Sequence, residues 1–204
     1  MRIGLVIEEF DPHRGGVEHW TVQFTAQLLE RGHEVHVVAR RFCDRALRMP
    51  IIAHGLEGVD SRLGFAAAAE QTLRRMDLDV IHDMGAGWHC NVFQPHGGSR
   101  RAATQRNLML VPPWMRGLKA AFQRFLPRYR QFNALVGRQY ADDGRIVLAL
   151  SRQVAEDFQR YHDVPREQIR LIYNGVDTQR FSPEHRETYR EMLRRRLGIP
   201  ADTV

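Results

Sequence analysis

The sequence has 204 residues, enough for one large domain, and 43% of them are hydrophobic, which excludes a disordered or fibrous chain. No apolar run reaches the ~18–20 residues that a membrane span needs. The net charge is +6, and the two cysteines, Cys43 and Cys90, form no disulfide framework, which is typical of a reducing compartment.

Strand and helix patterns alternate from the first residues onward. A short apolar strand over residues 2–8 is followed by a helix with Val17, Trp20, Phe24 and Leu28 at helical spacing, and Gly32 stands where that helix ends. We expect further strands over residues 34–39, 50–54, 79–83, 92–95, 145–150 and 169–173. This alternation predicts an α/β fold with a Rossmann-like, doubly wound, mostly parallel sheet.

Helix signals fill the intervals between the strands. We expect helices over residues 61–76, over 115–140 with a kink or split at Pro127, over 151–161, and from residue 182 onward. Ser151 is the expected N-cap of one helix, and Ser182 with Pro183 is expected to begin the last. Residues 202–204 resemble the beginning of another strand, so we expect the chain to be a fragment.

The charge is concentrated in one segment. Between Asp83 and Asp142 the sequence has no acidic residue and nine basic ones, whereas the rest of the chain sums to −3. Such asymmetry points to a polyanionic partner: a phosphorylated substrate, an anionic membrane or a nucleic acid.

Apolar residues recur every three or four positions through the same segment. They are Met115, Leu118, Phe122, Phe125, Tyr129, Phe132, Val136 and Tyr140. Rings among basic residues are typical of nucleic-acid binding or of a helix on an anionic bilayer. A stripe at this spacing more often faces the core, so we expect these side chains to pack inward and the arginines to face solvent.

Two features suggest a ligand site. Gly15 and Gly16 precede a helix N-terminus, where free amides and the helix dipole attract an anion; a tight structural turn is the alternative. His96 follows an extended run, and ligand-facing residues of parallel sheets lie beyond the carboxyl ends of strands. The alternative for His96 is a hydrogen bond to its own loop. Although His82, His89 and Cys90 lie nearby, their spacing does not favour a metal site.

Several motifs occur together in one order. They are Gly15-Gly16-Val17-Glu18, Arg31-Gly32-His33-Glu34-Val35, Asp79-Val80-Ile81-His82, Pro95-His96-Gly97, Ser151 with its helix, Val164-Pro165-Arg166-Glu167-Gln168-Ile169, Asn174-Gly175-Val176-Asp177 and Phe181-Ser182-Pro183. In this order they resemble the N-terminal half of a glycosyltransferase family 4 enzyme of the GT-B fold. The tail from Arg186 to Ile199 loosely resembles the lipopolysaccharide core glucosyltransferases.

The resemblance implies roles for particular residues. Gly15 and Gly16 would offer amides to the donor diphosphate, His96 would be the catalytic histidine, and Arg100 and Arg101 would meet an acceptor phosphate. A membrane-facing surface would comprise Trp114, Arg116, Lys119, Arg124, Arg128 and Arg130. No metal and no cofactor are expected, since amides and basic groups would meet the phosphates.

The resemblance also implies an organisation and a function. Residues 1–181 would form the acceptor-side domain, and residues 182–204 a linker helix and the truncated beginning of a donor-binding domain that follows in the same chain. We expect a retaining, sugar-nucleotide-dependent hexosyltransferase of cell-envelope glycan or glycolipid biosynthesis, inactive as this fragment. It would use a nucleotide sugar and a lipid-linked or glycan acceptor, at the cytoplasmic face of the inner membrane, without nucleic acid. The alternative is a non-catalytic α/β module that binds a polyanion through the basic segment.

Overall fold

A computed structural model of the chain describes residues 1–200 and 203, apart from the side chains of residues 123, 124, 127 and 128. The chain divides into two compact units, Met1–Ile172 and Tyr173–Val204. The domain boundary expected after residue 181 lies within the second unit and stays a prediction. The expected strand at 202–204 lies outside the described residues, except for Thr203, which is in no strand.

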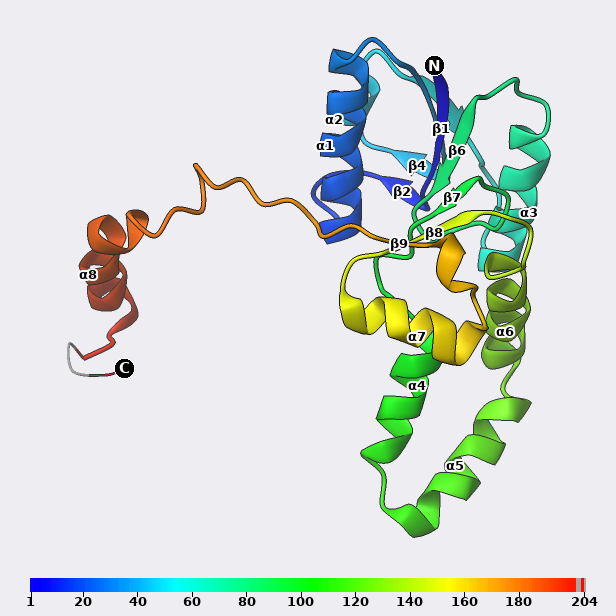
Figure 1. Ribbon diagram of the computed structural model, residues 1–204. Coiled ribbons are helices and arrows are strands. Elements are labelled where there is room, and N and C mark those ends of the chain that lie inside the picture. Colours follow the sequence, from blue (N-terminus) through cyan, green and yellow to red (C-terminus); the bar gives the residue numbers. More distant parts are fainter. Residues whose placement is uncertain (201–202, 204) are drawn as a thin grey trace. The chain divides into compact units, whose positions relative to one another are not determined.

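A seven-stranded parallel sheet forms the centre of the first unit (Figure 1). Its strands, in spatial order, are β5 (Ile52–Gly55), β3 (Glu34–Ala39), β1 (Arg2–Val6), β6 (Val80–Asp83), β7 (Val92–Phe93), β8 (Ile146–Ala149) and β9 (Ile169–Leu171). The order runs outward from β1 in both directions, so β1 and β6 flank the switch point of the topology. The predicted fold class is confirmed.

Alternation along the strands explains why helices cover both faces of the sheet. Leu5 pairs in register with Val37, and both pack in a cluster with Phe24 of α1 (Gly16–Glu30). Their neighbours Val6 and Val38 point to the other face, in a cluster with Phe65 of α3 (Arg62–Leu73). Period-two burial on parallel strands thus places α1 and α3 on opposite sides of β1 (Figure 1).

Three small elements carry no clear pattern in the sequence. The two-residue strands β2 (Glu9–Phe10) and β4 (Arg41–Phe42) pair in parallel as a second sheet. The short helix α2 (Asp44–Leu47) is capped by the Cys43 thiol, which accepts from the Ala46 amide. Strands of two residues are too short to show any alternation.

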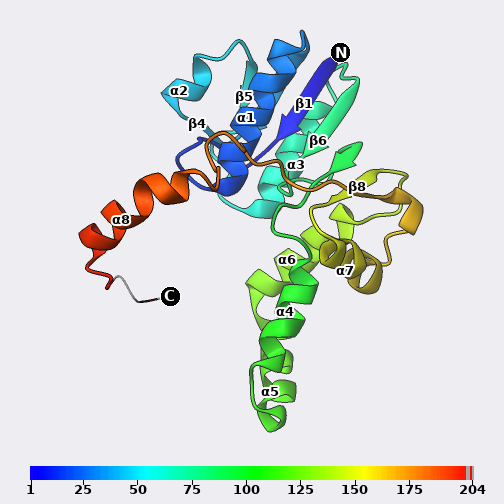
Figure 2. The same ribbon diagram turned by 60° about the vertical axis from the view of Figure 1, so that its left-hand side comes forward.

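Four helices follow β7 and β8. They are α4 (Arg100–Met109), α5 (Pro113–Phe125), α6 (Pro127–Gln139) and α7 (Arg152–His162), and a 3₁₀ turn, Arg166–Gln168, leads into β9. The helix break at Pro127 and the Ser151 cap on the Val154 amide are confirmed. Helix α4 was not predicted, because its sequence is mostly polar and has no apolar periodicity. In Figures 1 and 2, α5 extends away from the sheet.

The prediction that the apolar stripe from Met115 to Tyr140 packs inward is wrong for α5. Leu118, Phe122 and Phe125 are 73%, 64% and 82% exposed, whereas Val136 is buried and Tyr140 joins the core cluster around Phe158. The main contacts of α5 in the described structure are with its neighbours α4 and α6. Helical spacing reveals an apolar face but not what covers it.

The described residues of the second unit contain one helix, α8 (His185–Leu197), which ends at Gly198 in the left-handed conformation. The prediction that Ser182 is the N-cap and Pro183 the first residue of this helix is wrong by two residues, because Glu184 is the N-cap. The Ser182 hydroxyl accepts from the Glu184 amide at 3.3 Å, and the His185 amide donates to the Ser182 carbonyl at 3.1 Å. These bonds form a turn that precedes the helix.

Candidate functional site

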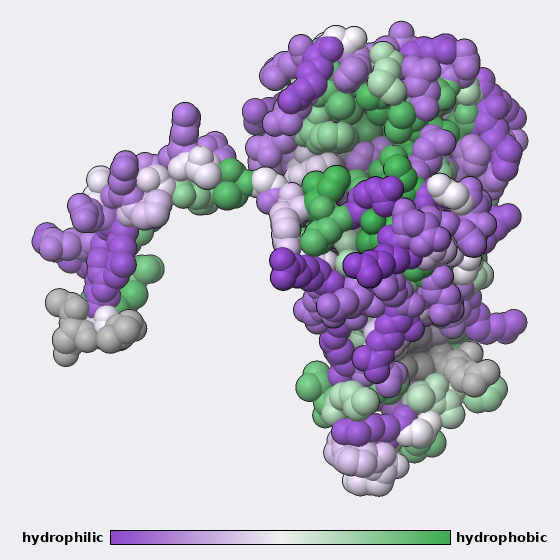
Figure 3. Space-filling view, in the orientation of Figure 1, coloured by the Kyte–Doolittle hydropathy of each residue, from purple (hydrophilic) through white to green (hydrophobic). Residues whose placement is uncertain are grey.

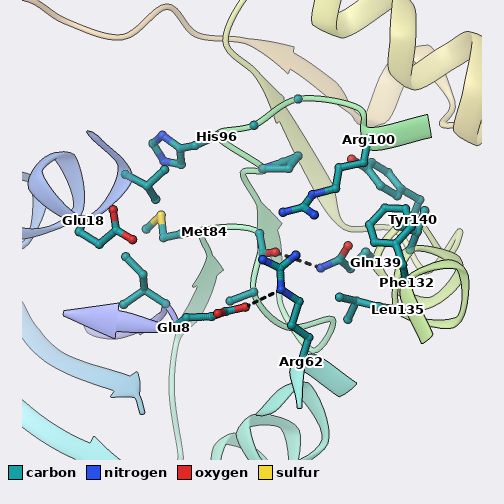
Figure 4. A pocket seen from close by; sticks show the side chains of 18 residues that line it. Glu8, Glu18, Arg62, Met84, His96, Arg100, Phe132, Leu135, Gln139 and Tyr140 are labelled. Carbon is teal, nitrogen blue, oxygen red and sulfur yellow. Dashed lines mark hydrogen bonds and ion pairs between the residues drawn. The ribbon is translucent and has the colours of Figure 1, made fainter. Parts of the chain in front are cut away.

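A cavity of about 300 Å³ opens at the carboxyl ends of β1, β6 and β7. Residues directly after each strand line it: Ile7 and Glu8 after β1, Met84–Ala86 after β6, and Pro95–Gly98 after β7. The first turn of α1 and the inner face of α6 complete the wall (Figure 4). Ligands of doubly wound sheets bind at this edge, next to the switch point between β1 and β6.

His96 lies in a tight turn that the sequence fixes locally. The Gly98 amide donates to the Pro95 carbonyl at 2.8 Å, and Gly98 adopts a φ of 64°, which glycine tolerates best. The imidazole packs 4.7 Å from the Trp20 ring, between centroids. His96 lines the cavity, and its Nε2 is buried without a hydrogen-bond partner among the described residues.

Burial keeps His96 uncharged. Desolvation lowers the pKa of the His96 imidazole to about 4, so the ring is neutral at pH 7. A neutral imidazole can accept one hydrogen bond and donate another, or take up a proton from a reacting hydroxyl. The alternative considered for His96 is a hydrogen bond to its own loop, and Nε2 makes no such bond among the described residues.

A second histidine supports this arrangement from behind. His82 Nε2 lies 2.8 Å from the Gln94 side-chain oxygen, and burial lowers the pKa of His82 to about 4. Because the Gln94 oxygen can only accept, the neutral ring carries its proton on Nε2 and donates it to Gln94. Trp20 stacks on Phe24, which meets the His82 ring edge-on at 5.6 Å. This aromatic cluster fixes the side of the cavity that carries His96.

The turn after β6 is built around the buried Asp83. Its carboxylate accepts three backbone amides, those of Gly85, Ala86 and Gly87, each at 2.7 Å. Complete burial raises the Asp83 pKa to about 6 in spite of these bonds. The Gln139 amide donates to the Gly85 and Gly87 carbonyls at 3.2 and 3.0 Å, which ties α6 to the same turn. These hydrogen bonds hold the turn of residues 84–87, which we call the cavity floor, in a fixed position.

Gly15 and Gly16 lie at the beginning of α1, beside the cavity rather than in its lining, which begins with Val17 and Glu18. Gly15 is the N-cap, and no side chain caps the helix. A Cβ at Gly15 would stand 2.8 Å from Glu18 Oε2, so that carboxylate lies over the N-terminus. The donor-diphosphate role of the two glycines stays a prediction.

Arg100 and Arg101 point to different surroundings. Arg100 lines the cavity, and its guanidinium lies 5.5 Å above the Phe132 ring. Arg101 donates to the Tyr161 carbonyl at 3.0 Å and is not among the residues that line this cavity. The predicted acceptor contacts of both residues stay predictions.

Arg62 and Glu8 belong to the site but were missed by the sequence analysis. Arg62, at the beginning of α3, lies 3.4 Å from the Glu8 carboxylate across the cavity (Figure 4). Their positions in the sequence were the available signal: Glu8 is the last residue of the expected first strand, two residues beyond the end of β1, and Arg62 directly follows the Ser61 cap. Phe132 and Gln139 were missed as lining residues, because helical spacing does not tell a core face from a cavity wall.

The surface predicted to face a membrane lies on α5 and its flanks. Trp114 is 81% exposed, and Lys119 and Arg130 are exposed, whereas Arg116 donates to the Val111 and Met109 carbonyls and so holds the turn between α4 and α5. The side chains of Arg124 and Arg128 lie outside the described residues. Apolar side chains gather around α5 at the foot of Figure 3.

The described residues form neither a metal-ion cluster nor a membrane-spanning helix. No group of three or more histidine, cysteine, aspartate or glutamate side chains is placed to hold a metal ion. No described helix combines the length and the apolar character that crossing a membrane requires.

Comparison with known proteins identifies the family of this chain. The sequence profile of Glycosyltransferase Family 4 matches residues 14–180. No curated protein sequence gives a significant match.

Solved structures share the fold at low sequence identity. WaaG, a glycosyltransferase involved in lipopolysaccharide biosynthesis, superposes with a TM-score of 0.72 at 17% identity, over 98% of this chain and 52% of that one. A glycosyltransferase from Rickettsia africae ESF-5 gives 0.51 at 15% identity, over 99% and 50%. The chain thus spans about half the length of these structures. With the profile match over most of the sequence, the chain belongs to glycosyltransferase family 4, as the N-terminal domain of a GT-B fold.

Proposed function

We propose that this chain is the acceptor-side half of a retaining, sugar-nucleotide-dependent glycosyltransferase of cell-envelope glycan or glycolipid biosynthesis. The observation that carries the proposal is the cavity at the switch point of the sheet, with the neutral His96 imidazole on its wall and its Nε2 unpartnered. A hexosyl transfer needs a group that can hydrogen-bond the reacting hydroxyl at neutral pH, and a neutral imidazole can do so.

The donor would meet the cavity from the side of α1. The free amides of Gly15, Gly16 and the residues after them carry the positive end of the helix dipole, which favours the donor diphosphate. The Glu18 carboxylate would have to turn away from that N-terminus when the diphosphate arrives. The nucleotide itself would bind to a second half, joined in the same chain. With phosphates met by amides and basic groups, the reaction would need no metal and no cofactor.

The acceptor would be presented at a membrane surface. We place the enzyme at the cytoplasmic face of the inner membrane, docked through Trp114, Arg116, Lys119, Arg124, Arg128 and Arg130. The exposed apolar face of α5 supports this, because Trp114, Leu118, Phe122 and Phe125 share one side of the helix and can enter the interface between headgroups and acyl chains. Each nearby basic residue adds about 1 kcal/mol on an anionic leaflet.

The test is a panel of nucleotide sugars offered to the protein in which this chain continues into its donor-binding half. We expect hydrolysis or transfer with one donor, and none with residues 1–204 alone, because the donor clamp would be absent. Turnover by the 204-residue chain, or no turnover with any donor by the longer protein, would contradict the proposal. In the latter case, tight binding of duplex DNA would favour the polyanion-binding alternative.

A further inference from the structure

A second and larger cavity, of about 890 Å³, lies next to the first. The beginning of α3, the outer side of α4 and the first half of α6 form its walls. The two cavities share five lining residues, which are Arg62, Gly97, Arg100, Phe132 and Leu135. A volume of this size accommodates a drug-sized or sugar-sized ligand. The proposed function assigns no particular ligand to this cavity.

Two arginines meet at the junction of the cavities. Figure 4 shows the guanidinium groups of Arg62 and Arg100 reaching into the same space from α3 and α4. Burial, together with the positive charge of Arg62, lowers the pKa of Arg100, and the negative charge of Glu8 opposes this. Among the five residues that line both cavities, Arg62 and Arg100 are the only charged ones, so the junction carries positive charge, whereas Glu8 and Glu18 line the first cavity and Asp60 lines the larger one.

Neither guanidinium is saturated by its present partners. Arg62 meets Glu8 through Nε at 3.4 Å, and its side chain is half exposed. Arg100 is placed over the Phe132 ring rather than against a carboxylate. A guanidinium offers five donors in a fixed fork, the geometry that binds a carboxylate or a phosphate through two parallel hydrogen bonds.

The rest of the larger cavity is suited to a carbohydrate. Phe132 and Tyr129 contribute aromatic side chains to its lining, and Thr104, Asn107 and Gln131 contribute a hydroxyl and two amides. The Thr104 hydroxyl donates to the Arg100 carbonyl at 2.9 Å and can still accept a hydrogen bond. Ring faces pack against the apolar face of a pyranose, while amides and hydroxyls match its hydroxyl groups. Asp60 also lines this cavity, but it is not among the charges that act on Arg100.

We infer that the larger cavity binds the acceptor as a sugar with an anionic substituent, a phosphate or a carboxylate, held by Arg62 and Arg100 together. In this arrangement Arg62 exchanges Glu8 for the anion, so Glu8 competes with the ligand. That the bound sugar is the acceptor rests on the proposed function, whereas binding of an anionic sugar does not require that function.

The experiment titrates the 204-residue chain with glucose, glucose 6-phosphate and glucuronate by calorimetry. These probes share a pyranose and differ in the anion. We expect one anionic sugar to bind at least ~10-fold tighter than glucose, since each charge-assisted hydrogen bond contributes roughly 1.5–3 kcal/mol. Preference for glucose 6-phosphate identifies a phosphate site, and preference for glucuronate identifies a carboxylate site.

Four variants test the residues. We expect Arg62→Ala and Arg100→Ala each to weaken the anionic sugar ~10-fold while glucose changes little. Arg75→Ala is the matched control. It removes the same charge from an exposed residue just beyond the other end of α3. Glu8→Gln should strengthen binding about two- to fivefold, as expected for the loss of a competing, partly exposed ion pair. A purely structural Glu8–Arg62 pair would not give that increase.

The outcomes separate this inference from the proposed function. The inference is overturned if no anionic sugar binds better than glucose, or if Arg75→Ala weakens binding as much as Arg62→Ala, which indicates general charge attraction. Sugar transfer by the longer protein without any anionic-sugar binding contradicts the inference alone. Binding that depends on Arg62 and Arg100 in a protein without transfer activity contradicts the proposed function alone.

Discussion

The turn that carries the cavity floor and the helix α5 represent opposite ways of using side chains. In the floor, one buried carboxylate accepts three amides, and Gln139 binds the same turn from α6. On α5, large apolar side chains such as Phe125 and Leu118 are exposed to solvent. The hydrogen bonds of the first region hold the turn in one geometry. The second keeps an apolar surface uncovered, which marks an interaction surface when the patch is large and rimmed by charge.

The largest effect is expected when the buried imidazole of His96 is removed from the cavity. His96→Ala in the longer, active protein should lower the rate of sugar transfer about 10²–10⁴-fold, the range for a positioned acid–base group. The melting temperature should change little, because Nε2 makes no hydrogen bond that would be lost. His19→Ala, an exposed histidine on α1, is the control. A variant with unchanged turnover, or one that unfolds, would assign His96 a structural role.

The next effect tests how rigid the floor is. A Cβ at Gly87 would stand 2.5 Å from Asp83 Oδ2, an atom that is itself bound to the Gly87 amide. Gly87→Ala should therefore lower the free energy of unfolding by about 1–3 kcal/mol. Gly117→Ala is the control, since nothing lies within 4 Å of a Cβ there. Equal stability of the two variants in urea denaturation would mean that the floor adapts.

The uncovered region predicts binding rather than stability. Lys119→Glu with Arg130→Glu should weaken binding to anionic vesicles at least ~10-fold, given about 1 kcal/mol per basic residue at the surface. The binding should also fall with salt, because the Debye length shortens from ~10 Å at 0.1 M to ~3 Å at 1 M. Co-sedimentation measures both. Arg48→Glu with Arg75→Glu makes the same charge change at other exposed positions, and an equal loss there would remove the argument for α5.

The smallest effect concerns pH. Burial lowers the pKa of His82, His96 and His162 to about 4, so between pH 6.5 and 4 the unfolded chain binds protons that the folded chain does not. Asp83, raised to about 6, acts in the opposite direction with one proton. Stability should therefore fall as the pH drops from 6.5 to 4. His82→Gln should reduce the slope by at most about 1.4 kcal/mol per pH unit. The free energy of unfolding of the wild type and of His82→Gln is measured at pH 5 and 6, and an equal change with pH in the two proteins would contradict this.

The sequence was sufficient for the sheet but not for the surroundings of the site. Alternation and glycine positions located β1, β3 and α1 closely, because local pattern and burial coincide there. His96 was found because it follows a strand, and its distance from Trp20 then came from the fold. Arg62 meets Glu8 only through the crossover that brings α3 beside β1, and no local pattern encodes such a pairing. The apolar face of α5 was found, but its exposure was not, since periodicity gives a direction without a neighbour.

The place of α5 in the chain has a mechanical consequence. The helix leaves the body from the end of α4 and returns to it through α6, and both of those helices form walls of the larger cavity. Because α5 contacts both helices, a force that displaces α5 acts on α4 and α6 together, and so on the parts of the cavity wall that carry Asn107 and Gln131.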